Sequence, residues 1–260
     1  MSKIILNEKK RAEEIIENPD LINHKKPSTD VAILARYFYH EEKLNRNQIV
    51  KKIDLIMEDG YPFYNDFNWY NTILSYIKLA QKKNLVQIDY VPVTKKELDK
   101  ISSVNEERKE RVLFTMLCLS KYYNQVNENN NNWINTIDSE IFKLANVNMK
   151  SMYRDKMIYS FINEGYLKQS KNNKNNNLMV TFLDETDEPV LKISDYRELG
   201  YQYMFYRNNK MIKKCQNCGI FIKIKSKYDG STKYCKNCAE KITRENWRLS
   251  KKKIKVENSK

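Results

Sequence analysis

Two Cys-x-x-Cys pairs near the C-terminus constrain this 260-residue chain more than any other feature. Cys215 and Cys218 form the first pair, Cys235 and Cys238 form the second, and 16 residues lie between them. A Cys-x-x-Cys turn aims two sulfur atoms in the same direction, and two such turns complete the tetrahedral four-thiolate shell that structural Zn²⁺ prefers. The spacing therefore predicts a closed Zn²⁺ site that holds structure and does not activate water.

The residues around the two pairs predict the local fold of this site. Gly219, directly after the first pair, supplies the backbone freedom that such a knuckle needs. Apolar residues from 221 to 224 indicate a short strand, residues 227–231 indicate a turn, and a helix is expected from about Ala239. A hairpin followed by a helix that carries the last ligands resembles a treble-clef or zinc-ribbon finger.

Other interpretations of the four cysteines stay open. Two disulfides would suit a secreted protein, but Met1 leads into charged residues rather than an apolar signal segment. A redox centre uses one Cys-x-x-Cys pair beside a βαβ pattern, whereas this chain has two matched pairs. An iron–sulfur cluster also takes four thiolates, and the spacing does not separate it from zinc. We expect structural zinc on the spacing of the motif.

The overall composition predicts an intracellular, cytoplasmic protein without a membrane partner. Mean hydropathy is −0.76, and no stretch reaches the apolar length that a transmembrane helix needs. The fifth cysteine, Cys118, lies in the apolar run 113–119, where a buried free thiol is typical. With no secretion signal, free thiols indicate a reducing compartment. Five glycines and five prolines argue against a turn-rich β protein and against glycine-rich phosphate loops.

The net charge of +14 is concentrated at one end of the chain. Residues 206–260 hold 17 Lys and Arg against 4 acids, a balance of +13, whereas residues 1–205 hold 30 against 29. A four-thiolate Zn²⁺ site would carry about −2 and leave about +11. Such a positive surface is typical of contact with nucleic-acid phosphates, and its alternative is a solvated, frayed tail. The candidate contacts are Lys213, Lys214, Lys223, Lys225, Lys227, Arg244, Arg248, Lys251 and Lys252.

The remainder of the chain predicts a mainly α (α+β) fold in which two similar units precede the finger. Amphipathic helices followed by strand-like segments give each unit the order of a winged helix-turn-helix, and the second unit fits that order better. The predicted organisation is 1–26 N-terminal helix and connector, 27–104 and 105–188 winged-helix-like units, 189–210 connector, and 211–260 finger and basic helix.

The connector contains two features with more than one interpretation. The acidic run 184–188 fits a solvated turn better than a carboxylate metal site. Tyr201, Tyr203 and Phe205 alternate as aromatic residues of a strand do. Exposed, these rings would stack on bases; buried, they would seat the finger on the helical units. Burial is the expectation, because strand aromatics usually pack.

Three strings and the cysteine pairs carry a resemblance over the whole chain. Residues 117–124, 140–147 and 191–201, together with the finger, resemble proteins of phages and mobile elements of low-GC bacteria that combine winged-helix-like segments with a C-terminal zinc-ribbon or treble-clef finger. The resemblance implies a mobile-element context and no established activity.

No catalytic constellation is recognisable in the sequence. His24 and His40 have no evident partner, no serine or cysteine nucleophile has one, and no phosphate-binding loop or small-molecule site is apparent. The sequence therefore predicts a non-enzymatic protein that binds DNA or RNA in the regulation or replication of a phage or mobile element. The alternative is a protein-binding inhibitor or adaptor, for example an anti-defence protein acting on a host nucleic-acid machine. Two observations favour that alternative: residues 1–205 are nearly neutral, and the third predicted helix of each winged-helix-like unit has few bases.

Overall fold

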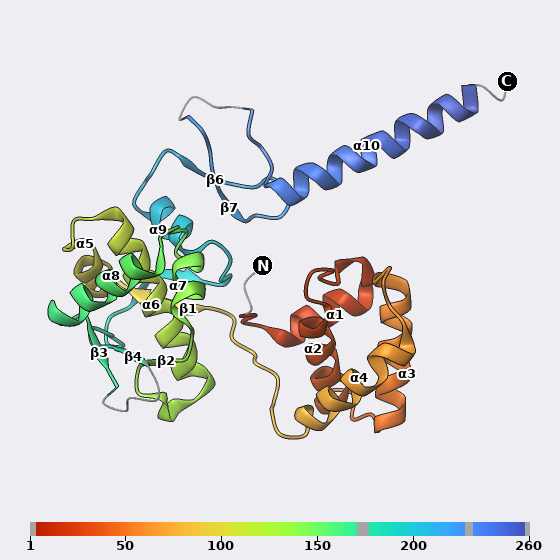
Figure 1. Ribbon diagram of the computed structural model, residues 1–260, viewed down its shortest axis with the longest axis horizontal. Helices are drawn as coiled ribbons and strands as arrows, with labels where there is room; N and C mark the ends of the chain where they lie inside the picture. The colour runs from red at the N-terminus through yellow and green to blue at the C-terminus, as the bar shows by residue number, and fades with distance from the viewer. Residues whose placement is uncertain (1–3, 171–176, 227–230, 258–260) are drawn as a thin grey trace. The chain divides into compact units, whose positions relative to one another are not determined.

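A computed structural model describes residues 4–170, 177–226 and 231–257, apart from the side chains of residues 245, 248, 249 and 251–257. The chain divides into two compact units, one of Met1–Val91 with Lys192–Tyr196 and one of Pro92–Leu191 with Arg197–Lys260. Helices make up most of the described residues and the strands are short (Figure 1). The prediction of a mainly α fold with small sheets is confirmed.

The first unit is built from helices around one apolar core. Each helix turns an apolar stripe inward, and residues such as Ile15, Leu34, Phe38, Ile53 and Ile73 are buried together. A capping box, in which Asn45 and Gln48 satisfy each other's backbone N–H groups, starts the third α-helix. The elements are α1 (Glu8–Glu17), η1 (Pro19–Leu21), α2 (Pro27–His40), α3 (Arg46–Gly60) and α4 (Asp66–Ala80).

The strand-like segment that the sequence predicts after the helices of this unit, at residues 85–91, does not form a hairpin wing in the described part of the unit. Gln87 forms an isolated bridge with Asn7, and Val91 at the end of the segment begins the strand Val91–Thr94. Backbone hydrogen bonds join the segment to the N-terminal segment, from Glu8 N–H to Val86 O at 2.8 Å and from Ile88 N–H to Leu6 O at 2.9 Å. The apolar alternation correctly indicated an extended backbone. Its hydrogen-bonding partner, however, is the N-terminal segment and not a neighbouring strand of a hairpin.

The second unit surrounds one buried helix, α6 (Glu107–Val126). Every residue from Glu110 to Lys121 is buried, which agrees with a helix that is covered on all sides. The elements of this unit are β1 (Val91–Thr94), α5 (Lys95–Ser102), α6, η2 (Glu128–Asn130), β2 (Trp133–Ile134), α7 (Asp138–Leu144), α8 (Ser151–Asn163), β3 (Leu167–Gln169), β4 (Leu178–Val180), β5 (Pro189–Ile193), α9 (Leu199–Tyr206), β6 (Ile212–Lys214), β7 (Phe221–Lys223) and α10 (Lys236–Glu257). The strands β1 and β5 pair with each other. Val91 of β1, and Lys192 and Ile193 of β5, belong to the first unit.

The strands β3 and β4, which follow α8, form a three-stranded antiparallel sheet with β2, which precedes α7, in the order β2-β4-β3. Leu167 pairs with Val180 and Gln169 with Leu178, while Trp133 pairs with Met179 on the other side of β4. The sequence predicted the helices before this sheet and the strand–turn–strand within it. It did not predict β2, because two residues are too few for a periodic signal.

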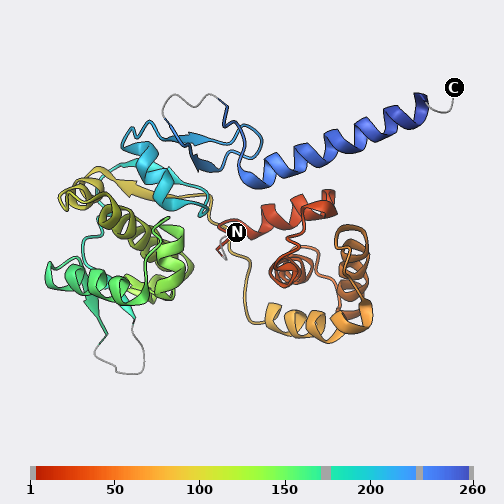
Figure 2. The same cartoon turned by 45° about the horizontal axis from the view of Figure 1, so that its top comes forward.

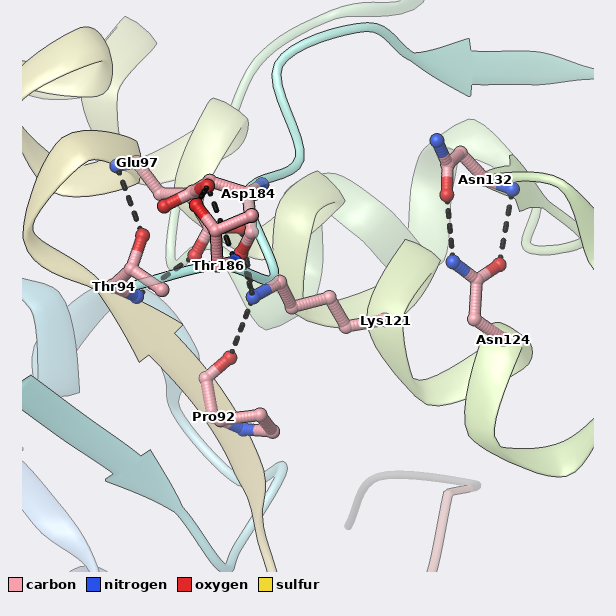
Figure 3. A network of polar contacts seen from close by, with 8 residues as sticks. All are labelled: Pro92, Thr94, Glu97, Lys121, Asn124, Asn132, Asp184 and Thr186. Atoms are coloured by element: carbon pink, nitrogen blue, oxygen red, sulfur yellow. Dashed lines mark hydrogen bonds and ion pairs between the residues drawn. The ribbon is translucent and has the colours of Figure 1, made fainter. Parts of the chain in front are cut away.

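A buried ion pair fastens α5 to α6 (Figure 3). Lys121 Nζ lies 2.7 Å from Glu97 Oε1, and the two side chains are 5% and 0% exposed. The ammonium also donates to the carbonyl oxygens of Pro92 and Asp184, at 3.0 and 3.2 Å. Glu97 accepts from the backbone N–H of Thr94 at 2.8 Å and of Asp184 at 2.9 Å. Because both charges are hydrogen-bonded, their burial is tolerated.

Candidate metal centre

The four predicted ligands meet at one point of the second unit. The first pair follows β6, and the second pair spans the start of α10. The four Sγ atoms all lie within 4.8 Å of one another, and the Cys218 and Cys235 sulfurs are 3.7 Å apart. Zn–S bonds of about 2.3 Å place tetrahedral sulfurs about 3.8 Å apart, whereas a disulfide requires about 2.05 Å. The cluster therefore fits a four-coordinate ion.

The backbone of the first pair forms the expected knuckle. Cys215 N–H donates to Ile220 O at 2.8 Å, and Gly219 N–H donates back to Cys215 O at 2.9 Å. Closing this turn puts Gly219 at φ 69°, in the left-handed region where a side chain is strained. The prediction of a knuckle glycine directly after Cys218 is confirmed.

Hydrogen-bond donors surround the sulfur atoms. Cys235 N–H donates to Cys215 Sγ at 3.2 Å, and Asn217 Nδ2 donates to Cys238 Sγ at 3.3 Å. Burial alone would raise the pKa of Cys215, but N–H groups of Cys235, Cys218 and Asn217 outweigh it and lower that pKa to about 6. Burial and the neighbouring sulfurs raise the pKa of Cys218 to about 12. A bound cation stabilises all four thiolates and removes this conflict.

The helix α9 seats the finger on α6 through aromatic side chains. Tyr203 is 1% exposed, its ring centroid lies 5.1 Å from that of Phe114, and its hydroxyl donates to Glu110 at 2.8 Å. Phe205 faces the finger, 5.2 Å from the Phe221 ring. The prediction that these aromatics alternate along a strand was wrong, because the segment is helical and its rings serve two different neighbours.

The candidate phosphate contacts fall into three groups. Lys214, Lys223 and Lys225 are exposed on or beside the β6–β7 hairpin, and Lys213 is half-buried there. Arg244 is exposed on α10 and lies 3.9 Å from Glu240. Lys227 and the side chains of Arg248, Lys251 and Lys252 lie outside the described residues.

Lys214 has a specific environment that sequence reasoning missed. Its ammonium lies 5.8 Å from the Phe205 ring centroid and 5.2 Å from that of Phe221. Lys214 and Phe221 are direct cross-strand partners in the hairpin, which places their side chains on one face. A cation–π contact of this kind orients the charge and keeps it exposed. The only sequence signal was an aromatic residue beside the metal knuckle.

The basic helix α10 begins three residues earlier than expected, at Lys236, and continues unbroken to Glu257 (Figure 2). The second cysteine pair therefore spans its start, with Cys238 in its first turn, so an ion bound by the four cysteines would fix the beginning of the helix. Within the described residues, no helix has the length and apolar composition to cross a membrane.

No family model, curated protein or solved structure matches this chain.

Proposed function

We propose that the C-terminal finger and α10 bind DNA or RNA through phosphate contacts, with a structural Zn²⁺ holding the finger. The observation that most supports this proposal is the uneven distribution of charge: the net charge is +13 in residues 206–260 and +1 in residues 1–205. The described lysines of the hairpin support it, because Lys214, Lys223 and Lys225 are exposed around one rigid metal knuckle. Lysines held in this way bind phosphates and release counterions.

The donor set supports zinc as the resident ion. Four cysteine sulfurs within 4.8 Å provide a complete soft shell without an open position. The ion in this proposal stabilises the finger, and the proposal assigns no catalytic step to any residue. A cytoplasmic location in a phage or mobile-element context belongs to the same proposal.

The second unit supports a winged helix-turn-helix as the body that carries the finger. Its element order α6-β2-α7-α8-β3-β4 and its sheet order β2-β4-β3 support this proposal, in which the β3–β4 hairpin corresponds to the wing. In this comparison α8 is the second helix of the helix-turn-helix. This helix carries only two bases, Arg154 and Lys156, beside one acid, Asp155, and Arg154 Nη1 donates to the backbone carbonyl of Met149 at 3.0 Å. Phosphate affinity is therefore assigned to the finger and α10.

The test is a salt titration of binding to labelled duplex and single-stranded oligonucleotides. Replacing Lys214, Lys223 and Lys225 together by alanine is expected to reduce the slope of log K against log salt by about 0.9 for each duplex phosphate that the variant no longer neutralises. Lys51, Lys78 and Lys82, exposed in or near helices of the first unit, provide a control triple variant with the same change of charge. Absence of binding at low salt, or equal weakening in both triple variants, contradicts the proposal.

A protein-binding adaptor is the second candidate, favoured by exposed apolar side chains on α8. Met152, Tyr153 and Tyr159 are 56%, 51% and 66% exposed, and aromatic residues of this kind anchor protein interfaces. A stoichiometric protein partner that survives nuclease treatment and is lost in Tyr159→Ser would select this candidate. Unchanged association of that variant would remove it.

A further inference from the structure

An aromatic surface in the first unit has no role in the proposed nucleic-acid contact. Six of the ten residues from 61 to 70 are aromatic. We name this set the aromatic corner: Tyr61, Phe63, Tyr64, Phe67, Trp69 and Tyr70. It lies where α3 ends and α4 begins. Aromatic residues at this density are rare on a surface and common at interfaces.

Three rings of the aromatic corner form its base. Tyr61, Tyr64 and Trp69 are half-buried and pack against the core of the unit. The Trp69 ring lies 6.0 Å from Tyr61 and 6.4 Å from Tyr64. Tyr64 precedes the N-cap Asn65 of α4, and its contact with Trp69 is a hydrophobic staple that fixes how the chain enters the helix. Tyr64 also donates from its hydroxyl to Asp54.

The other three rings face solvent from this rigid base. Phe63 is 77% exposed, Phe67 is 86% exposed and Tyr70 is 48% exposed. Phe67 and Tyr70 are three residues apart on α4 and so are neighbours on its surface. Two phenylalanines that expose most of their area, Phe63 in the turn before α4 and Phe67 on α4, indicate a binding surface.

The charge around the aromatic corner limits what can bind there. Residues 53–77 contain four acids, Asp54, Glu58, Asp59 and Asp66, and no lysine, arginine or histidine, in a chain with a net charge of +14. Glu58, Asp59 and Asp66 are exposed. Phosphates and anionic membranes are repelled by such a surface, whereas a basic apolar segment is attracted to it.

The helix α10 has the complementary properties. Residues 236–257 hold eight bases and three acids, a balance of +5, together with Ile242, Trp247, Leu249, Ile254 and Val256. Among its described side chains after Cys238, Ile242 is half-buried and the others are exposed, with Trp247 at 60%. Helices obtain most of their stability from a packed apolar face, so α10 gains from a partner that covers its apolar residues.

We propose that the aromatic corner binds α10 of a second copy of this chain. Acidic side chains around Phe63 and Phe67 would receive the bases of the helix, and the exposed rings would cover its apolar residues, as in helix-in-groove recognition. Reciprocal docking gives a closed two-fold dimer rather than an open chain of molecules. This inference does not depend on nucleic-acid binding.

Sedimentation velocity on nuclease-treated full-length protein tests the proposal at low salt over a wide concentration range. The wild type is expected at about twice its 31.2 kDa mass at high concentration. Phe67→Ser is expected to weaken the dimer about thirtyfold, as loss of an interface anchor does. Serine suits the first turn of α4, so folding is preserved. Tyr159→Ser removes a ring that is 66% exposed on α8, outside both proposed surfaces, and is expected to leave the dimer unchanged.

A charge exchange identifies the two surfaces. Glu58→Lys with Asp59→Lys, and separately Lys241→Glu with Arg244→Glu, are each expected to abolish the dimer, and the two pairs mixed as separate proteins are expected to restore association. A wild type that stays monomeric overturns the proposal. So does a dimer insensitive to Phe67→Ser, or a mixture that does not associate. Circular dichroism shows whether each variant is folded. If a charge-reversed variant is unfolded, the conservative pair Glu58→Gln and Asp59→Asn replaces it and is expected to weaken the dimer.

Discussion

Replacing Cys235 by serine is expected to unfold the finger and leave the helical part of the second unit folded. The apolar core of the finger is small, with Ile212 and Ile224 at 3% and 2% exposure as its buried aliphatic residues in the described chain. Burial of an isoleucine side chain contributes about 1.5–3 kcal/mol, so this pair supplies about 3–6 kcal/mol. Zn²⁺ in a four-ligand finger contributes about 10–16 kcal/mol. A bound Zn²⁺ would therefore be the larger contribution to the stability of the finger.

Native mass spectrometry and hydrogen exchange measure this prediction together. The wild type is expected to carry one Zn²⁺ per chain, and Cys235→Ser none. Amides of residues 211–240 are expected to exchange at unprotected rates in the variant, while α6 keeps its protection because its core includes Phe114 and other residues outside the finger. The control is Cys118→Ala, which removes a buried thiol of α6 and is expected to keep the full metal content.

Two results would refute the four-thiolate assignment. One is a Cys235→Ser protein that keeps one ion and an unchanged exchange profile. The other is a wild-type protein without zinc or iron whose four finger cysteines are all alkylated in the native state. A loss of mass equal to four hydrogens, reversed by reductant, would instead show two disulfides, which the 3.7 Å separation of the Cys218 and Cys235 sulfurs argues against.

Three further predictions concern the helical part of the second unit. Lys121→Met leaves the carboxylate of Glu97 buried without its cation and is expected to lower the unfolding free energy by about 3–5 kcal/mol. Adding Glu97→Gln is expected to recover part of the loss, and chemical denaturation of the wild type and the two variants measures both effects. Gly200→Ala would press a Cβ onto the backbone at the end of α7 and is expected to cost about 1–3 kcal/mol, with exchange of α9 as the readout. Burial, then repulsion by Asp155, raises the pKa of Asp138 in the folded state. The protonated side chain therefore contributes to the free energy of unfolding at acid pH, and this contribution is lost as pH rises through the folded-state pKa. Asp138→Asn is thus expected to raise the melting temperature at neutral pH and to change it little in strong acid; a decrease at neutral pH would contradict this assignment.

The metal centre was predictable because its information is local. Two sulfurs three residues apart and a following glycine specify a knuckle wherever the chain places it, and the structure brings Cys215 and Cys238 together as expected. The helices of both units were predicted for a similar reason, since an apolar stripe of period 3.6 does not depend on its partner. The helix ends are set by capping groups such as Asn45 and Asn65, which the apolar period does not locate.

The elements that were missed depend on partners far along the chain. The ion pair of Lys121 joins α6 to α5, a helix that the sequence did not reveal, across 24 positions. The α9 aromatics misled because Tyr203 and Phe205, two residues apart, lie on nearly opposite sides of a helix. Aromatic rings on opposite sides suit α9, because this helix packs against α6 on one side and against the finger hairpin on the other. Alternation with a period of two residues does not by itself distinguish such a helix from a strand.

A bound ion at the cysteine cluster would also explain how so basic a helix can form. Starting a helix is unfavourable because the first turn fixes several residues for one hydrogen bond. In α10 this turn includes Cys238, and the hydrogen bond from Ala239 N–H to Cys235 O, 2.9 Å long, closes within the ligand set. An ion that fixes the second pair therefore removes the cost of nucleation, and propagation through repelling lysines becomes possible. Both partners proposed for α10, a phosphate backbone and the aromatic corner of a second copy, would neutralise the same charges and compete for the helix. Removal of one ion is consequently expected to abolish both interactions, although neither partner touches the metal.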